Sequence, residues 1–235
     1  MGEYKVICRE RGGLTAQALV ILQRVIIERS GLTVSVSDTG EASLIFDICS
    51  DEIGLEGYRI SDTASGALRI SGGCGRGLLY GVGRFLHEAR FSEGCVVPGA
   101  WRGTSVPQCS LRGIYLALHQ NYYSFAPVAE LVRYIEELAL WGLNTVAFHL
   151  PIPLDPDAPA ARAAHERHRA VLKGAKAVGM RVALLDSINC GDIDAPQAAY
   201  APQFPDSDPP RRGYSGIRVC PSHPEGFAYL AARMT

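Results

Sequence analysis

The stretch Leu111-Arg-Gly-Ile-Tyr-Leu-Ala-Leu118 opens the pattern that decides the fold of this chain. It is a nearly continuous apolar run, which is typical of a β-strand that is buried on both faces of a parallel sheet. Two further runs of this kind follow, Asn144-Thr-Val-Ala-Phe-His-Leu150 and Arg181-Val-Ala-Leu-Leu-Asp186. We therefore predict three parallel strands between residues 111 and 186.

The segments between these runs have the apolar spacing of amphipathic helices. One predicted helix has Pro127 near its first turn and stops at Gly142, and a second runs from about residue 159 to Gly179. A third helix is predicted to begin near Ser222. Because strands and helices alternate with short joins, we expect right-handed βαβ units and the first three β/α units of a (β/α)8 barrel over residues 111–235.

The first 92 residues show a different pattern, with short β-rich segments and two helices. The predicted strands cover residues 4–9, 44–48, 57–60 and 67–70, and the predicted helices cover residues 14–29 and 77–90. The last two strands are expected to form a hairpin. Residues 93–110 carry Gly, Pro and Ser without periodicity, which indicates a connector. We expect a small α+β domain over residues 1–92, a linker over residues 93–110 and the barrel start over residues 111–235.

Composition excludes several classes of function. The chain has 235 residues, of which 47% are hydrophobic and 20% charged, so it can form real hydrophobic cores. Its 23 basic and 24 acidic residues give a net charge of -1, which disfavours binding to nucleic acid or to an anionic membrane. Since no signal peptide and no apolar stretch of about 20 residues is present, we expect a cytoplasmic protein.

Cysteine and histidine spacing indicates neither a disulfide framework nor a metal site. The seven cysteines are scattered singly, and an odd number without any C-x-x-C pair is typical of free thiols. His165 and His168 have i,i+3 spacing rather than the i,i+4 spacing of a zinc-binding helix. We expect no metal and no cofactor.

The glycine-rich stretch Gly72-Gly-Cys-Gly-Arg-Gly77 follows a predicted strand and opens a predicted helix. This context raises the possibility of nucleotide binding at a helix N-terminus. The dinucleotide pattern is not met, because its third glycine falls on Leu78. We expect these glycines to allow a tight turn, with Gly77 and Gly81 allowing the helix to pack closely on the sheet. A nucleotide-binding α/β protein is the weaker alternative.

Two parts of the sequence resemble a known family. The segments Gly57-Tyr-Arg-Ile60, Leu68-Arg-Ile70 and Arg76-Gly-Leu-Leu-Tyr-Gly81 resemble the N-terminal, zincin-like domain of glycoside hydrolase family 20 β-hexosaminidases and family 67 α-glucuronidases. Leu111 to Leu116, with Leu138 to Leu150, resembles the first two barrel strands of these enzymes. The resemblance implies hydrolysis of O-glycosidic bonds, with an oligosaccharide or glycoside as substrate.

The resemblance also implies roles for two residues. Arg112 matches the arginine that in family 20 holds hydroxyls of the terminal sugar, and His149 matches a histidine of the same pocket. Where the family usually continues with an aspartate and an arginine, this chain has Ala117 and Gln120. Without the resemblance, the position of Arg112 at the beginning of a strand predicts an ion-pair partner at the opposite end of the barrel.

Polar residues follow each of the three predicted strands. These are His119 and Asn121 after the first, His149 at the end of the second, and Asp186 and Asn189 after the third. Barrels of this type place their active site at the carboxyl ends of the strands. We therefore predict that these five residues, with Arg112, bind the sugar.

The predicted barrel is incomplete. The residues after 110 are about half of the ~250 that a complete barrel takes. In family 20 the catalytic Asp-Glu pair follows strand four, whereas the Asp-Glu pair of this chain, Asp51-Glu52, lies in the first predicted domain. We therefore assign no catalytic residue and expect this chain to be inactive without the C-terminal half of the barrel. The alternative is a non-catalytic carbohydrate-binding or interaction module.

Overall fold

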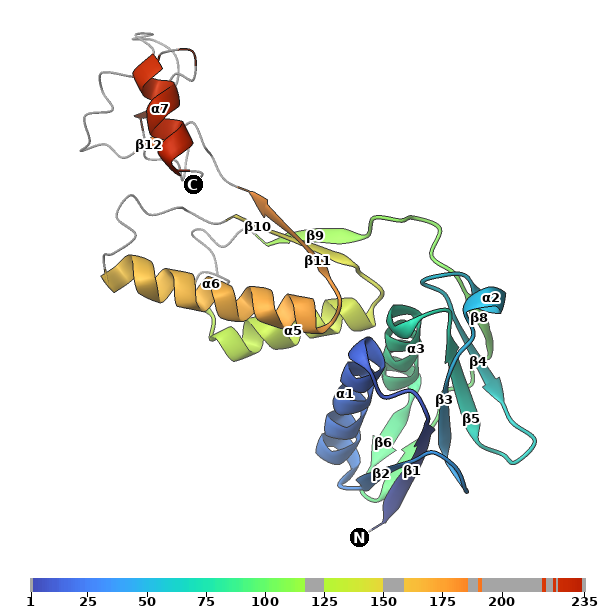
Figure 1. Ribbon diagram of the computed structural model, residues 1–235. Coiled ribbons are helices and arrows are strands. Elements are labelled where there is room, and N and C mark those ends of the chain that lie inside the picture. Colours follow the sequence, from blue (N-terminus) through green and yellow to red (C-terminus); the bar gives the residue numbers. More distant parts are fainter. Residues whose placement is uncertain are drawn as a thin grey trace. The chain divides into compact units, whose positions relative to one another are not determined.

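The computed structural model describes residues 2–116, 125–149, 159–185, 190–191, 217–218, 222 and 224–233 (Figure 1). The chain divides into two compact units. The first comprises Met1–Ile114, Ala129–Val146 and Leu172–Val182, and the second comprises Tyr115–Val128, Ala147–Val171 and Ala183–Thr235. The predicted boundaries near residues 92 and 110 stay predictions.

A six-stranded mixed sheet forms the centre of the first unit. Its strands are β1 (Glu3–Cys8), β2 (Thr33–Ser37), β3 (Leu44–Ile48), β4 (Tyr58–Asp62), β5 (Leu68–Gly72) and β8 (Gly103–Ser105), in the order β2-β1-β3-β5-β4-β8. The first four strands in this order are parallel, whereas β4 is antiparallel to both of its neighbours. The predicted hairpin is confirmed, since Ile60 of β4 lies opposite Ile70 of β5.

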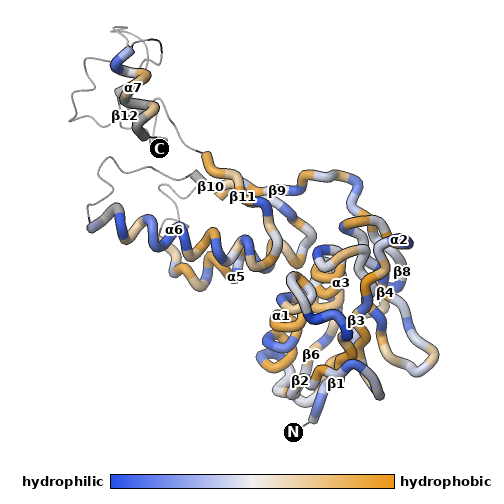
Figure 2. The backbone as a smooth tube through the Cα atoms, viewed as in Figure 1, coloured by the Kyte–Doolittle hydropathy of each residue, from blue (hydrophilic) through white to orange (hydrophobic). Residues whose placement is uncertain are grey.

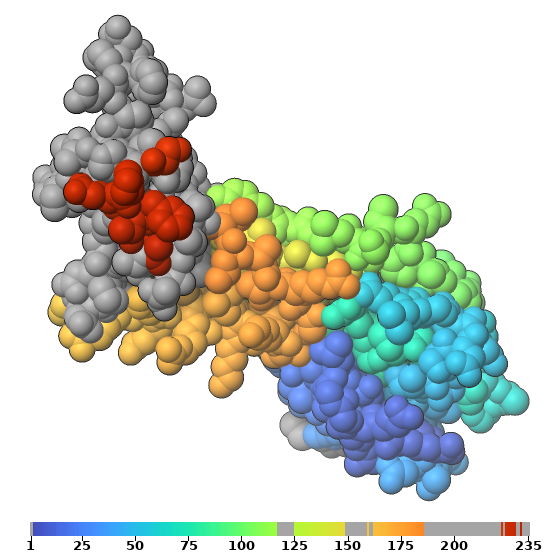
Figure 3. Space-filling model, turned by 45° about the horizontal axis from the view of Figure 1, so that its top comes forward, coloured from blue at the N-terminus to red at the C-terminus, as the bar shows by residue number. Residues whose placement is uncertain are grey.

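Two helices cover one face of this sheet, α1 (Gly13–Ser30) and α3 (Gly75–Glu88) (Figure 1). Every second residue of the central strands points into this core, where Val6, Phe46 and Ile70 are buried. Figure 2 shows the hydrophobic residues of α3 and the central strands. Helix α1 is capped at its C-terminus by Gly31, whose left-handed backbone (φ 68°) lets its N–H donate to the carbonyl of Ile27. In Figure 3 the atoms of the first three strands and of α1 and α2, coloured blue to cyan, form one continuous surface.

Several short elements were not predicted. They are β2, the four-residue helix α2 (Ser50–Ile53), and the strands β6 (Arg90–Ser92), β7 (Cys95–Val97) and β8. Strand β8 lies within the predicted connector but pairs with β4 at the edge of the sheet. Three residues are too few to show an alternating pattern, which is why the sequence indicated only a connector there.

A separate three-stranded sheet contains β9 (Gly113–Leu116), β10 (Thr145–His149) and β11 (Arg181–Leu185), in the order β11-β10-β9. The Asn144 N–H donates to the Arg112 carbonyl, and the Arg181 N–H donates to the Asn144 carbonyl, both at 2.8 Å. Since the residues that precede the three strands are bonded side by side, the strands begin at one edge and run parallel. The three predicted strands are confirmed, and the barrel that they are expected to open stays a prediction.

Helices α5 (Val128–Leu140) and α6 (Pro159–Ala177) separate these strands in the sequence, close to their predicted bounds. The chain also contains a small antiparallel pair, β12 (Cys190–Gly191) and β13 (Ile217–Arg218), followed by α7 (Pro224–Arg233). None of the helices in the described ranges is long and apolar enough to span a membrane.

Candidate functional site

The predicted sugar-binding residues follow the ends of the three parallel strands. Strand β9 ends at Leu116, β10 at His149 and β11 at Leu185, so the carboxyl ends of these strands share one edge of the sheet. Residues 119, 121, 186 and 189 lie outside the described residues, as does the side chain of His149. Their arrangement in a pocket therefore stays a prediction.

Arg112 lies at the other edge, directly before β9 begins. Its Nη2 atom donates to Glu56 Oε2 at 2.5 Å and to the Tyr80 hydroxyl at 3.2 Å. Its Nε atom donates to the Gly142 carbonyl at 2.7 Å, and Nη1 donates to the Cys109 carbonyl at 2.5 Å. All three guanidinium nitrogens thus bond to protein oxygens, as expected of an ion-pair partner at the start of a strand. The sugar contact that the resemblance implies stays a prediction.

Glu56 is the centre of a polar cluster in the first unit. Its Oε1 accepts a hydrogen bond from Arg76 Nη1 at 2.5 Å, and Oε2 accepts from Arg112 and, at 3.2 Å, from Asn144 Nδ2. Arg76 also donates to the Gly179 carbonyl at 2.7 Å. We name Glu56, Arg76, Tyr80, Arg112 and Asn144 the Glu56 cluster. It binds the segments that precede β10 and β11 to the loop before β4.

The surroundings of Glu56 favour its ionised form over its protonated form. Partial burial raises the pKa of Glu56, but hydrogen bonds from Arg112, Arg76 and Asn144 outweigh it, so the pKa lies below its ordinary value. Burial, with the Glu56 charge, raises the pKa of Tyr80. Glu56 is therefore ionised and Tyr80 neutral near pH 7. The cluster suits anchoring, because neither group is in the state that a general acid or a phenolate nucleophile needs.

Sequence reasoning found one member of this cluster, Arg112, and missed its carboxylate partner. Glu56 stands alone in a loop between two predicted strands, and no local pattern marks it. Asn144 was expected only as the start of a buried strand. A fully buried polar residue at that position is a signal that only the structure provides.

The glycine-rich turn from Gly72 to Gly77 is closely packed. A Cβ atom added to Gly73 would strike the backbone of Gly54, and one added to Gly77 would strike the backbone carbonyl of Gly57. A Cβ atom on Gly81 would strike the Ile70 side chain of β5. These contacts explain why glycine stands at these positions, because backbone segments approach too closely for a side chain.

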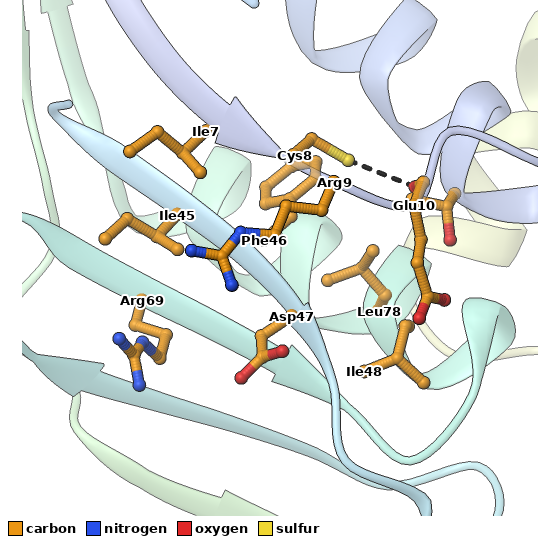
Figure 4. Close-up of a pocket in the computed structure, with 11 residues that line it drawn as sticks. Ile7, Cys8, Arg9, Glu10, Ile45, Phe46, Asp47, Ile48, Arg69 and Leu78 are labelled. Atoms are coloured by element: carbon orange, nitrogen blue, oxygen red, sulfur yellow. Dashed lines mark hydrogen bonds between the residues drawn. The ribbon is translucent and has the colours of Figure 1, made fainter. Parts of the chain in front are cut away.

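A cavity of about 390 Å³ lies near the carboxyl ends of β1 and β3 (Figure 4). Arg9, Asp47 and Arg69 line it together with apolar Ile7 and Ile45. This mixture suits a small polar ligand, although the sequence indicated no site there.

The buried thiol of Cys8 also borders this cavity, and it donates to the Glu10 carbonyl at 3.2 Å. Burial raises the pKa of this thiol, so it stays protonated near neutral pH. Because the thiolate is the reactive form, Cys8 is a poor nucleophile.

The described residues hold no group of three or more His, Cys, Asp or Glu side chains that could bind a metal ion. Within the same part of the chain, five cysteines have free thiols: Cys8, Cys49, Cys74, Cys95 and Cys109.

Comparison with known proteins gives a clear likeness of fold. No protein-family model matches the chain, and no curated protein matches it in sequence. A mutant β-hexosaminidase from Streptomyces plicatus, solved with its product GlcNAc, aligns with 99% of this chain and 53% of its own, at 17% identity and a TM-score of 0.69. A family 20 β-N-acetylhexosaminidase from Streptomyces coelicolor aligns with 98% of this chain and 53% of its own, at 19% identity and a TM-score of 0.67.

A family 20 exo-β-N-acetylglucosaminidase from Vibrio harveyi, in complex with N-acetylglucosamine, aligns with 97% of this chain and 40% of its own, at 15% identity and a TM-score of 0.70. The chain thus spans about half the length of these enzymes or less. At this level of identity the likeness shows the fold alone. The zincin-like character of the first domain and the likeness to α-glucuronidases stay predictions.

Proposed function

We propose that this protein is carbohydrate-directed and of the glycoside hydrolase type. The observation that carries the proposal is the match of nearly the whole chain to family 20 enzymes, two of which were solved with N-acetylglucosamine (GlcNAc) bound. The substrate class is a glycoside or oligosaccharide, and a terminal N-acetylhexosamine is the first sugar to test.

The sugar-binding site of this proposal lies at the carboxyl ends of β9, β10 and β11. Its residues are the five polar ones that follow these strands: His119, Asn121, His149, Asp186 and Asn189. Imidazole and amide groups both donate hydrogen bonds to hydroxyls and accept them, and an ionised carboxylate accepts them. Arg112 supports this site from the other edge of the sheet, since its guanidinium holds the start of β9 to Glu56 and to the Gly142 carbonyl.

The reaction class is hydrolysis of an O-glycosidic bond. The bond between the anomeric carbon and the leaving oxygen breaks, the leaving oxygen takes a proton from a carboxylic acid, and a water molecule supplies the new hydroxyl. Among the five proposed residues only Asp186 carries a carboxylate. The proposal for this chain is therefore sugar binding.

Titration calorimetry with N-acetylglucosamine and with glucuronic acid tests this proposal. We expect binding of one of these sugars, weakened at least tenfold by His149→Ala and by Asp186→Asn, because each variant removes a hydrogen-bonding group from the proposed site. His165→Ala on α6 and Asp51→Asn on α2 are matched controls at exposed positions and should bind as the unchanged protein does. Binding of neither sugar, or binding that both site variants leave intact, would contradict the proposal.

A further inference from the structure

A second pocket opens in the first unit, between α3, the β4–β8 edge of the sheet and the end of α5. Its volume is about 420 Å³, and its lining includes Tyr58, Arg84, Glu88, Ser105 and Trp141. This volume falls within the ~300–1,000 Å³ of typical small-molecule sites. Aromatic rings and charged groups therefore line one pocket, and none of the five residues proposed at the carboxyl edge of the β9–β11 sheet is among them.

Trp141 is an exposed ring that is held in place. It follows the last residue of α5 and is 65% exposed, although tryptophan is a residue that folding usually buries. The Trp141 indole N–H donates to Glu137 Oε1 at 3.1 Å, and the ring stacks on His87 with centroids 4.2 Å apart and planes 19° apart. His87 Nε2 lies 2.7 Å from the same Glu137 oxygen. His87 thus covers one face of the indole, and because Trp141 is 65% exposed we infer that the other face is open to a ligand.

Helix α3 contributes a charge pair to the lining of the pocket. Arg84 Nη2 lies 2.6 Å from Glu88 Oε1, and the Arg84 guanidinium also lies over the Trp101 ring, 4.8 Å from its centroid. These two contacts fix the guanidinium, whose planar set of donors lies beside a carboxylate acceptor. Arg112 also lines the pocket and is paired with Glu56. Because both arginines have a carboxylate partner, the pocket favours a neutral ligand with several hydroxyls over an anion.

We propose that this pocket, named the Trp141 pocket, is a second carbohydrate-binding site that takes a single pyranose ring. The apolar C–H face of the sugar stacks on the free face of Trp141, and its hydroxyls bond to Arg84, Glu88 and Ser105. An amphipathic ligand of this kind matches a site that combines an aromatic ring with polar groups. The choice of a sugar, rather than another neutral ligand, rests on the proposed function.

The fluorescence of Trp141 provides a direct test. The chain has two tryptophans, so Trp101→Phe leaves Trp141 as the only indole and keeps an aromatic ring beneath Arg84. This variant is titrated with N-acetylglucosamine and with its β-1,4-linked trimer. We expect a saturable shift of the Trp141 emission to shorter wavelength, because stacking removes water from the ring. A spectrum that neither sugar changes would overturn the inference.

Calorimetry on the 235-residue chain separates this site from the carboxyl edge. Trp141→Ala should weaken one class of binding at least tenfold, and Glu88→Gln, which keeps the shape, should weaken it several-fold. Phe227→Ala on α7 is the matched control, since Phe227 is an aromatic residue that is 62% exposed and lies outside the pocket. It should bind like the unchanged chain.

The His149→Ala variant distinguishes failure of the inference from failure of the proposed function. Binding that His149→Ala removes and Trp141→Ala leaves intact overturns the Trp141 pocket and supports the proposed function. Binding that Trp141→Ala removes, with the Trp141 emission shift preserved in His149→Ala, supports the Trp141 pocket. If no sugar binds the chain in either experiment, both proposals fail.

Discussion

Arg112 Nη2 lies 2.5 Å from Glu56 Oε2, although the two residues are 56 positions apart in the sequence. The same carboxylate accepts hydrogen bonds from Arg76 and Asn144. One acidic side chain therefore pairs with two guanidinium groups and accepts a hydrogen bond from a buried amide. The Glu56 side chain is 14% exposed, which places this interaction largely out of water. Replacing the carboxylate leaves the two arginines without their partner.

The Glu56→Gln variant should therefore be less stable than the unchanged protein. Breaking a fully buried ion pair costs ~3–5 kcal/mol, because one charge remains buried without its partner. The guanidinium groups here keep some contact with water, so we expect a loss of roughly 2–3 kcal/mol in the free energy of unfolding. Urea denaturation followed by circular dichroism measures this loss.

Glu52→Gln is the matched control for this experiment. Glu52 pairs with Arg59 at 3.3 Å, but its side chain is 68% exposed. An exposed pair of this kind contributes ~0–1 kcal/mol. Equal losses in the two variants would show that the Glu56 cluster has no special weight in the fold.

Acid should weaken the fold through the same carboxylate. The pKa of Glu56 is lower in the folded protein than its ordinary value, so its contribution to stability is complete above the unfolded pKa of about 4.3. That contribution is lost as the pH falls through the folded pKa. We expect the difference in unfolding free energy between the unchanged protein and Glu56→Gln to be smaller at pH 3 than at pH 7. A difference that does not change with pH would show that Glu56 keeps its ordinary pKa.

Local patterns predicted most of the regular elements. Strand β3 was predicted with the bounds that the structure has, and β10 and α6 within about two residues, because the periodicity that defines them is contained in the elements themselves. The order of the strands and the partner of Arg112 depend on contacts between distant segments. The stacking of Trp141 on His87 is of the same kind, and no spacing in the sequence indicates it. Residues that follow strand ends could be proposed as a site because chain topology alone brings such ends together.

The close packing of α3 gives a test of the glycine-rich turn. In Gly77→Ala the new methyl group meets the backbone carbonyl of Gly57, which cannot turn away as a flexible side chain could. Overpacking of this kind costs ~1–3 kcal/mol, so we expect a loss of that size in the free energy of unfolding. Thermal denaturation, with the fold checked by circular dichroism, measures it.

Gly12→Ala serves as the control for this variant. Gly12 has φ -98°, which any residue adopts, and a Cβ atom added there meets nothing within 4 Å. The free energy of unfolding of Gly12→Ala should differ from that of the unchanged protein by less than ~0.5 kcal/mol. We also expect calorimetry with ATP and NAD to show no binding. Micromolar binding that Gly75→Ala abolishes would make the turn a nucleotide site.

The 235-residue chain should bind sugar without hydrolysing glycosides. Most glycoside hydrolases use two carboxyl groups about 5–10 Å apart across the scissile bond, and the five proposed residues at the carboxyl edge provide one, Asp186. Glu56 is ionised and held by Arg76 and Arg112, so it is in no state to donate a proton. Incubation with aryl N-acetylglucosaminide and aryl glucuronide should therefore release aryl alcohol at the rate of the buffer alone. Release above that rate that disappears in Asp186→Asn would show that this chain carries a complete catalytic set.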